Sequence, residues 1–193
     1  MQVYPTHWDW ELMIYLNNLS PEELDAFWSL ITHTKFWIPF YVVLLFLFFY
    51  KTEIKKSLFR MFLLVVAVGI THLFTELTKS LVGRLRPNET LELMNSIKVL
   101  YQPANFSFFS GHASTSFAAT VFIYIVLNSK FKALGFIFIW PVLFSLSRIF
   151  VGVHFPSDVL VGAFVGLVFG VLFSKLLGFS EEKLWSVSYQ DNT

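Results

Sequence analysis

The chain has 193 residues, of which 55% are hydrophobic, 19% aromatic and only 14% charged. A soluble domain carries about 25% charged residues, so this composition excludes an ordinary water-soluble protein and indicates an integral membrane protein. The absence of cysteine excludes disulfides and thiolate metal sites. A net charge of +1 gives no reason to expect a nucleic-acid partner.

Residues 8–19 are predicted to form an amphipathic helix that lies at the membrane interface. Its apolar residues recur at helical spacing: Trp8, Leu12, Tyr15, Leu16 and Leu19. Its polar residues fall mostly between them: Asp9, Glu11, Asn17 and Asn18. We interpret the chain as a single domain, with an N-terminal interfacial segment (1–27), a transmembrane core (28–178) and a cytoplasmic tail (179–193).

Five apolar stretches follow, each near the length of about 20 residues that a helix needs to cross a bilayer. They cover residues 28–50, 58–82, 110–127, 133–150 and 159–177. Only helices satisfy their own backbone hydrogen bonds in lipid, so the predicted fold is an all-α, polytopic membrane helical bundle. Pro39 and Pro141 fall inside two spans, where they could kink the helices. Gly162, Gly166 and Gly170 recur every four residues, a pattern typical of close helix packing.

Charged residues at the span ends predict the orientation in the membrane. Alternating crossings place the ends of spans two and four and the starts of spans three and five on one side. The other side carries eight cations: Lys51, Lys55, Lys56, Arg60, Lys130, Lys132, Lys175 and Lys183. Apart from Lys79, Arg86 and Arg148, which are described below, the side with the ends of spans two and four has only Lys35, Arg84 and Lys98. The positive-inside rule therefore predicts that this less basic side is external, periplasmic or extracellular in a bacterial cytoplasmic membrane.

Three further cations, Lys79, Arg86 and Arg148, lie on this external side. Cations converge on anions, and the planar guanidinium of arginine suits phosphate oxygens. Ser110 and Gly111 open the third span, where a hydroxyl and a backbone N–H at a helix N-terminus bind anions well. Together these residues predict a phosphate-binding site.

Two histidines on the same side could carry the chemistry. His154 lies four residues before Asp158, and a carboxylate can fix the tautomer of a histidine and stabilise its charged form. We therefore expect His154 to be the nucleophile and His112 to be the acid that protonates the leaving group. Glu76 lies three residues before Lys79, so it pairs with that cation or lines the headgroup pocket as an auxiliary residue.

These runs resemble the three signature motifs of the type 2 phosphatidic acid phosphatase superfamily. The first is Lys79 followed after six residues by Arg86 and Pro87, and the second is Ser110-Gly111-His112. The third runs from Ser147 and Arg148 through His154 to Asp158. The resemblance implies a phosphohistidine on His154, orientation of that histidine by Asp158, general acid–base catalysis by His112, and no metal or other cofactor.

The sequence departs from the family pattern in two places. Phe109 replaces the usual proline before Ser110, which puts the shape of that loop in doubt rather than the chemistry. Many family members have six spans, whereas five are apparent here. Outside the motifs, we interpret His33 and His72 as packing residues. Arg84 and Lys98 are interpreted as solvated loop residues, or as contacts for a second phosphate or an anionic headgroup.

The predicted function is a membrane lipid phosphatase whose substrate enters laterally from the bilayer. Undecaprenyl diphosphate is the first expected substrate; phosphatidylglycerol phosphate, phosphatidic acid and lipid A are alternatives. A lipid phosphotransferase needs the same residues and stays open. A vanadate-dependent haloperoxidase is disfavoured because no large soluble domain is present. An anion transporter is disfavoured because binding alone does not require two histidines and a carboxylate.

Overall fold

A computed structural model describes residues 6–190, and within that range the chain forms only helices and connecting loops. The α-helices are α1 (His7–Leu19), α2 (Asp25–Ile31), α3 (Ile38–Leu47), α4 (Ile54–Val82), α5 (Leu91–Met94), α6 (Gly111–Leu127), α7 (Ile139–Phe150) and α8 (Pro156–Gln190). Short 3-10 turns are η1 (Glu22–Leu24), η2 (Thr34–Trp37), η3 (Pro87–Glu89) and η4 (Leu134–Phe138). The predicted all-α fold class is confirmed.

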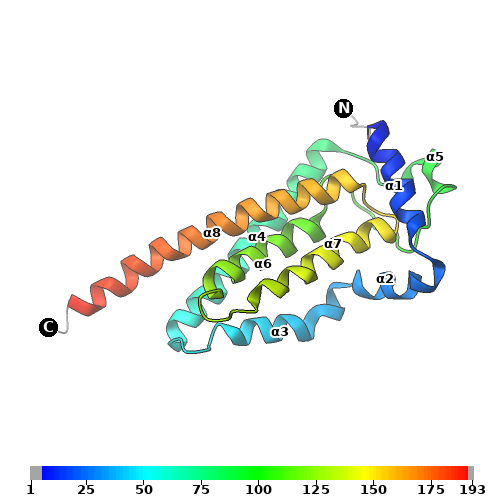
Figure 1. Ribbon diagram of the computed structural model, residues 1–193. Helices are drawn as coiled ribbons and strands as arrows, with labels where there is room; N and C mark the ends of the chain where they lie inside the picture. The colour runs from blue at the N-terminus through cyan, green and yellow to red at the C-terminus, as the bar shows by residue number, and fades with distance from the viewer. Residues whose placement is uncertain (1–5, 191–193) are drawn as a thin grey trace.

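Helix α6 forms the centre of the bundle and packs against α4, α7 and α8. The long helices run along one direction, while α1, α2 and α5 gather at one end (Figure 1). A buried cluster fills the other half of the bundle, with Leu64, Phe122, Leu127, Ile137 and Leu177 among its members. Because α6 begins at the end where α1 and α5 gather, its N-terminus lies beneath them.

All five predicted apolar stretches are helical, but the count of five spans stays a prediction. Within residues 6–190, only the helices over Ile54–Glu89 and Pro156–Trp185 qualify as spans by length and composition. The segments Glu22–Ile31 and Thr34–Leu47, which bend by 69° at their junction, would together make a third. Helices α6 and η4–α7 are apolar but shorter.

The two prolines do not kink a continuous helix. Pro39 is the second residue of α3 and Pro141 is the third residue of α7, and each of these helices follows a 3-10 turn. The N–H groups of a first helical turn have no helical acceptor, so a proline costs little there. The predicted first span is therefore interrupted before Pro39 rather than bent around it.

The outward surfaces of the two longest helices are apolar. On α4, Phe62, Val65 and Leu81 are exposed, and on α8 Leu160 and Phe164 are exposed. Large exposed apolar surfaces are rare on soluble monomers and match the hydrocarbon core of a bilayer. The chain is an integral membrane protein.

Three glycines bring α8 against the backbone of α6. A methyl group added at Gly162, Gly166 or Gly170 would lie only 2.6, 2.3 or 2.8 Å from the carbonyl oxygen of Ser110, Ser114 or Ala118, respectively. This confirms that the predicted small-residue ridge is a packing interface. It also places the first turn of α8 beside the start of α6, where the Ser110 N–H donates to the Asp158 carbonyl at 3.0 Å.

Helix α1 is present where the sequence predicts it, but its polar side chains are used differently. Trp8 and Tyr15 are exposed, whereas Asp9 and Asn17 are buried against α7 and α8. Asn17 donates to the carbonyl oxygen of Ile149 at 2.9 Å and accepts from the Lys98 N–H at 2.6 Å. These bonds satisfy a buried amide and fix α1 over the end of the bundle.

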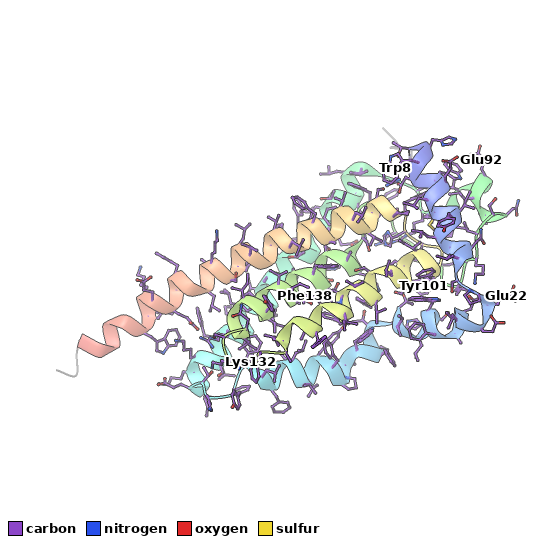
Figure 2. The ribbon with its side chains drawn as sticks, viewed as in Figure 1. Trp8, Glu22, Glu92, Tyr101, Lys132 and Phe138 are labelled. Carbon is purple, nitrogen blue, oxygen red and sulfur yellow. The ribbon has the colours of Figure 1, made fainter. Side chains whose placement is uncertain are left out.

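The two ends of the bundle differ in charge, as the sidedness argument requires. Figure 2 shows Lys132 at one end and Glu22 and Glu92 at the opposite end, where α1, α2 and α5 lie. At the lysine-bearing end, Arg60 donates to Glu181 at 2.6 Å and joins α4 to α8. The orientation of these ends relative to the two sides of the membrane stays a prediction.

Candidate active site

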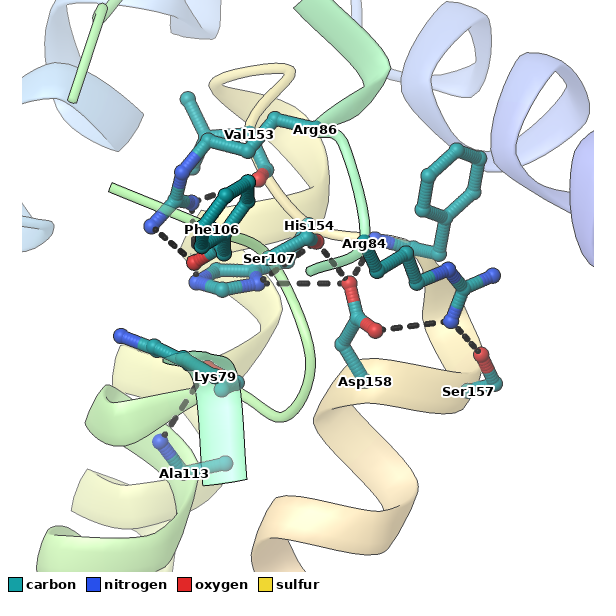
Figure 3. A network of polar contacts seen from close by, with 12 residues as sticks. Lys79, Arg84, Arg86, Phe106, Ser107, Ala113, Val153, His154, Ser157 and Asp158 are labelled. Atoms are coloured by element: carbon teal, nitrogen blue, oxygen red, sulfur yellow. Dashed lines mark hydrogen bonds and ion pairs between the residues drawn. The ribbon is translucent and has the colours of Figure 1, made fainter. Parts of the chain in front are cut away.

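The predicted site residues come from four helices and two loops and meet at one end of the bundle. Lys79 lies in the last turn of α4, Ser110 and Gly111 start α6, Arg148 lies in the last turn of α7, and Asp158 lies in the first turn of α8. His154 lies in the short α7–α8 connection, and Arg86 in the loop after α4. Figure 3 shows His154 between Arg86 and Asp158, with Lys79 on the α6 side.

The His154 imidazole is held from both sides. Arg86 Nη1 lies 3.1 Å from His154 Nε2, and Asp158 Oδ2 lies 3.4 Å from His154 Nδ1. Arginine is only a donor, so Nε2 must accept with its lone pair, and the proton of the neutral ring must lie on Nδ1. This tautomer points Nδ1–H towards Asp158 and leaves the Nε2 lone pair on the side of Arg86.

The His154 ring is kept neutral by its surroundings. Its side chain is buried, and burial is the largest cause that lowers its pKa well below the usual value, followed by the charges of Arg86 and Arg148. A neutral imidazole retains the Nε2 lone pair that attack on phosphorus requires.

Asp158 is fully buried and held by several donors. Its Oδ2 accepts from the Phe155 N–H at 3.0 Å and from the Ser107 hydroxyl, and its Oδ1 accepts from Arg84 Nη1 at 2.8 Å. Ser107 Oγ also lies 3.4 Å from His154 Nδ1. The carboxylate therefore has a fixed orientation towards the histidine before any substrate binds.

Arg86 is fixed by backbone and side-chain acceptors. Its Nε donates to the Asn105 carbonyl at 2.6 Å, its Nη2 to Asn105 Oδ1 at 2.6 Å, and its Nη1 to the Val153 carbonyl at 2.8 Å. Only 2% of Arg86 is exposed, so the guanidinium keeps its orientation through these bonds rather than through solvent.

Lys79 and Arg148 are the other two cations predicted to bind phosphate. Lys79 Nζ donates to Glu76 Oε1 at 2.8 Å, so the predicted helical ion pair is present. Asn105 Nδ2 also donates to Glu76 Oε2, at 3.2 Å, and Glu76 thus links Lys79 to the residue that holds Arg86. Arg148 Nη1 donates to Thr32 Oγ1 at 2.6 Å, while its buried Nε has no partner among the described residues.

The start of α6 leaves room beside these cations. Ser110 is the N-cap of the helix, and its Oγ accepts from the Ala113 N–H at 3.4 Å. A methyl group added at Gly111 would lie 3.7 Å from Lys79 Nζ, so the absence of a side chain keeps this ammonium open towards the helix N-terminus. Phe109, which stands where the family motif has proline, is buried.

His112 lies at the boundary between the polar site and an apolar cavity. Its Nε2 is 3.1 Å from the Thr32 carbonyl oxygen, and its ring packs on Phe144 with centroids 4.4 Å apart. The cavity has a volume of about 380 Å³ and is lined by residues of α3, α4, α6 and α7, including Tyr41, Leu64, Ala119 and Phe144. His112 is therefore placed between the cations and a space suited to an apolar group.

Several residues of this site were missed by the sequence analysis. Ser107, Asn105 and Thr32 contact the predicted site residues Asp158, Arg86 and Arg148, but they lie outside the motifs. Asp9 contacts Arg84, which in turn contacts Asp158. Arg84 was interpreted as a solvated or headgroup-binding residue, and this is wrong: it is 4% exposed and pairs with Asp9 and Asp158. Its place two residues before Arg86, in the turn after Gly83, was the one available signal.

Three other interpretations also change. His33 and His72 are exposed rather than packed in the interior. Lys98 is partly exposed but is not a free loop cation, because its Nζ donates to Asp25 at 2.5 Å and to the Ser20 carbonyl at 2.8 Å. This pair joins the loop between α5 and α6 to the start of α2.

Comparison with known proteins agrees with this geometry. The sequence profile described as the PAP2 superfamily matches residues 60–181. The chain belongs to the PAP2 superfamily. It is 30% identical to the lipid A 4'-phosphatase of Porphyromonas gingivalis, over 82% of this chain and 68% of that protein. It is 33% identical to the undecaprenyl-diphosphatase of Sulfolobus acidocaldarius, over 67% of this chain and 58% of that protein.

A solved structure has the same fold. The crystal structure of Aquifex aeolicus LpxE superimposes with a TM-score of 0.68 at 25% identity, covering 91% of this chain and 99% of that one. The chain is thus a membrane PAP2-type lipid phosphatase. Asp9, Thr32 and α1 lie outside the segment that the superfamily profile matches.

Proposed function

We propose that the protein removes a phosphate group from a membrane lipid through a phosphohistidine formed on His154, without a metal. The observation that carries this proposal is the arrangement around one imidazole. The Nε2 lone pair faces Arg86 at 3.1 Å, and Nδ1 faces Asp158 at 3.4 Å. This is the polarity that a nucleophilic histidine needs, with the attacking atom on the cationic side.

In the first step, phosphate oxygens would take over the hydrogen bond of Arg86 Nη1 and so release His154 Nε2. Nε2 then attacks phosphorus, a P–N bond forms, and the P–O bond to the lipid breaks. Lys79, Arg86 and Arg148 stabilise the charge on the equatorial oxygens, with the Ser110 hydroxyl and the Gly111 N–H as further donors. His112 gives its proton to the departing lipid oxygen.

In the second step, water would replace the lipid oxygen. His112, now lacking that proton, accepts one from water, whose oxygen attacks the phosphorus. The P–N bond breaks, inorganic phosphate leaves, and His154 returns to its neutral form. Asp158 stabilises the positive charge that the ring carries while phosphorylated, and the Nδ1 proton is kept throughout.

The apolar cavity beside His112 supports a lipid as the leaving group. It lies between α3, α4, α6 and α7, so a chain held there would place the scissile oxygen near the acid. The relative matched over the larger share of its own length is a lipid A 4'-phosphatase, which makes a lipid A 4'-phosphate the first substrate to test. Undecaprenyl diphosphate, expected from the sequence, is the second.

We propose further that the site opens on the external face of a bacterial cytoplasmic membrane. The support is the distribution of charge: Lys132 lies at the end of the bundle opposite the site (Figure 2), close in sequence to Lys130, whose Nζ donates to the Lys51 carbonyl. A basic end on the cytoplasmic side satisfies the positive-inside rule. Labelling of a single cysteine introduced at each end of the bundle, in intact cells, tests this orientation.

The experiment that tests the function is phosphate release by purified protein in detergent with EDTA. Lipid A, undecaprenyl diphosphate, phosphatidylglycerol phosphate and phosphatidic acid are offered in parallel. His154→Ala should abolish release, while His72→Ala is the matched control because His72 is an exposed histidine on α4 outside the predicted site residues. Activity retained by well-folded His154→Ala would overturn the proposal. Transfer of phosphate to an added acceptor lipid instead of water would identify a phosphotransferase.

A further inference from the structure

Helix α1 contributes one carboxylate to the interior of the site. Asp9 is 1% exposed although it lies on a helix with several exposed residues. Its Oδ1 accepts from the Ser157 N–H at 2.9 Å, and its Oδ2 accepts from the Ser157 hydroxyl at 2.5 Å and from Arg84 Nη2. Ser157 immediately precedes Asp158 in the first turn of α8, so Asp9 binds the N-terminus of the helix that carries the proposed catalytic carboxylate.

Arg84 connects Asp9 to Asp158. Its Nη1 donates to Asp158 Oδ1 at 2.8 Å and to Ser157 Oγ at 2.8 Å, while its Nη2 donates to Asp9. The guanidinium lies over the Phe155 ring, with Cζ 4.4 Å from the ring centroid. Figure 3 shows Arg84 on the side of Asp158 away from His154. One buried cation thus separates two buried carboxylates.

This arrangement gives Asp9 a task beyond packing. Arginine binds a carboxylate best through two parallel hydrogen bonds. Without Asp9, the Nη2 of Arg84 loses its acceptor, and the guanidinium can turn to hold Asp158 with both nitrogens. Such a rotation would draw the Asp158 carboxylate away from His154 Nδ1, which is already at 3.4 Å.

We infer that Asp9 is a positioning residue for the proposed reaction: it holds Arg84 and the start of α8 so that Asp158 presents Oδ2 to His154. The inference rests on the proposed function, because it assigns Asp9 a role at the same site. It makes α1 part of the active site rather than only an interfacial anchor. Asp9 does not touch the phosphate and acts through Arg84 and Ser157.

A double-mutant cycle tests this directly. Arg84→Gln leaves Asp9 and Asp158 as two buried carboxylates without the cation between them, and like charges at close range resist simultaneous ionisation. Adding Asp9→Asn removes one of these charges. We expect kcat of the double variant to exceed that of Arg84→Gln by roughly tenfold, which lies within the usual coupling of contacting residues.

Asn17→Ala is the matched control. Asn17 is also buried on α1, and it holds this helix to the bundle through backbone acceptors and donors at Lys98 and Ile149 rather than through Arg84. Combined with Arg84→Gln, it should give no recovery of kcat. Recovery by Asn17→Ala equal to that by Asp9→Asn would mean that loosening α1 is sufficient, and would overturn the inference.

Single variants provide a second measurement should Arg84→Gln fold poorly. Asp9→Asn keeps the shape of the side chain, so we expect kcat to fall at least tenfold with KM within about twofold. Unchanged kcat in Asp9→Asn, or a double variant no faster than Arg84→Gln, would overturn the inference. His154→Ala in the same assay reports on the proposed function separately, because its loss of activity does not depend on Asp9.

Discussion

Replacement of Asp158 by asparagine tests the hydrogen-bond polarity of the site with little change in shape. Asp158 Oδ2 accepts from the Phe155 N–H at 3.0 Å, and Oδ1 accepts from Arg84 Nη1 at 2.8 Å. An asparagine amide has only one oxygen. If this oxygen takes the Oδ1 position, the NH2 group faces two donors, Phe155 N–H and His154 Nδ1–H; if it takes the Oδ2 position, the NH2 group faces Arg84.

The expected cost follows from which contact survives. If the oxygen satisfies Arg84, His154 must release its Nδ1 proton and carry it on Nε2, which removes the nucleophilic lone pair. A comparable carboxylate-to-amide change in a serine-protease triad lowers kcat by about 10⁴, equivalent to about 5.5 kcal/mol. If the oxygen instead faces His154, an NH2 group opposes the buried Arg84, and breaking a buried ion pair costs about 3–5 kcal/mol of stability.

The assay measures kcat for phosphate release together with the thermal unfolding midpoint of each detergent-purified variant. We expect Asp158→Asn to lose at least 10³ in kcat while remaining monodisperse. Asp25→Asn is a suitable control, since Asp25 pairs with Lys98 at 2.5 Å on the same side of the bundle but has no contact with His154 among the described interactions. Activity of Asp158→Asn within tenfold of the wild type, together with an unchanged unfolding midpoint, would refute the proposed pairing of His154 with Asp158.

Three further predictions concern packing, protonation and metals. Gly166→Ala should lower the unfolding midpoint, because its methyl group would lie 2.3 Å from the Ser114 carbonyl and overpacking costs about 1–3 kcal/mol. Gly178→Ala is the control, because its methyl group would meet no atom within 4 Å and should leave the midpoint unchanged. Equal midpoints for the two variants would contradict the packing argument. Burial lowers the pKa of His154, so this side chain stays neutral below the usual titration range of histidine. The acid limb of kcat/KM, corrected for the second ionisation of the substrate phosphate at about 6, should therefore lie below the ordinary histidine value of 6.5; a limb at or above that value would contradict it. Phosphate release should keep its rate in EDTA because Lys79, Arg86 and Arg148 supply the positive charge; loss of activity that a divalent cation restores would show that a metal is required.

The local part of the site could be predicted from the sequence because its geometry is set within a few residues. A helix start fixes the donors of Ser110 and Gly111, and the four-residue separation of His154 and Asp158 spans one turn at the start of α8. Alternating crossings then bring the four motif positions to one end, since a helix that crosses the bundle can only end on the opposite side. The packing of Gly162, Gly166 and Gly170 could likewise be predicted, because small residues at that spacing are typical of a helix with a close neighbour.

The remainder depends on contacts between segments far apart in the sequence. Asn105 and Ser107 hold Arg86 and Asp158 from a loop that has no periodicity, so their spacing from the motifs carries no signal. Thr32 binds both His112 and Arg148 only because the predicted first span is interrupted there, between α2 and η2. Asp9 was assigned to the polar face of an interfacial helix, since acidic residues on an amphipathic helix are typical of a solvated face.

The burial of Asp9 follows from the charge balance of the site rather than from the helix that carries it. Phosphate binding requires Lys79, Arg86 and Arg148 to converge, and Arg84 adds a fourth buried cation behind Asp158. Buried charges need partners, and within the motifs only Asp158 is acidic. If Asp158 were the only carboxylate paired with Arg84, it would be less available to the His154 imidazole. Asp9 of α1 supplies the second carboxylate, through its contacts with Arg84 and with Ser157 at the start of α8.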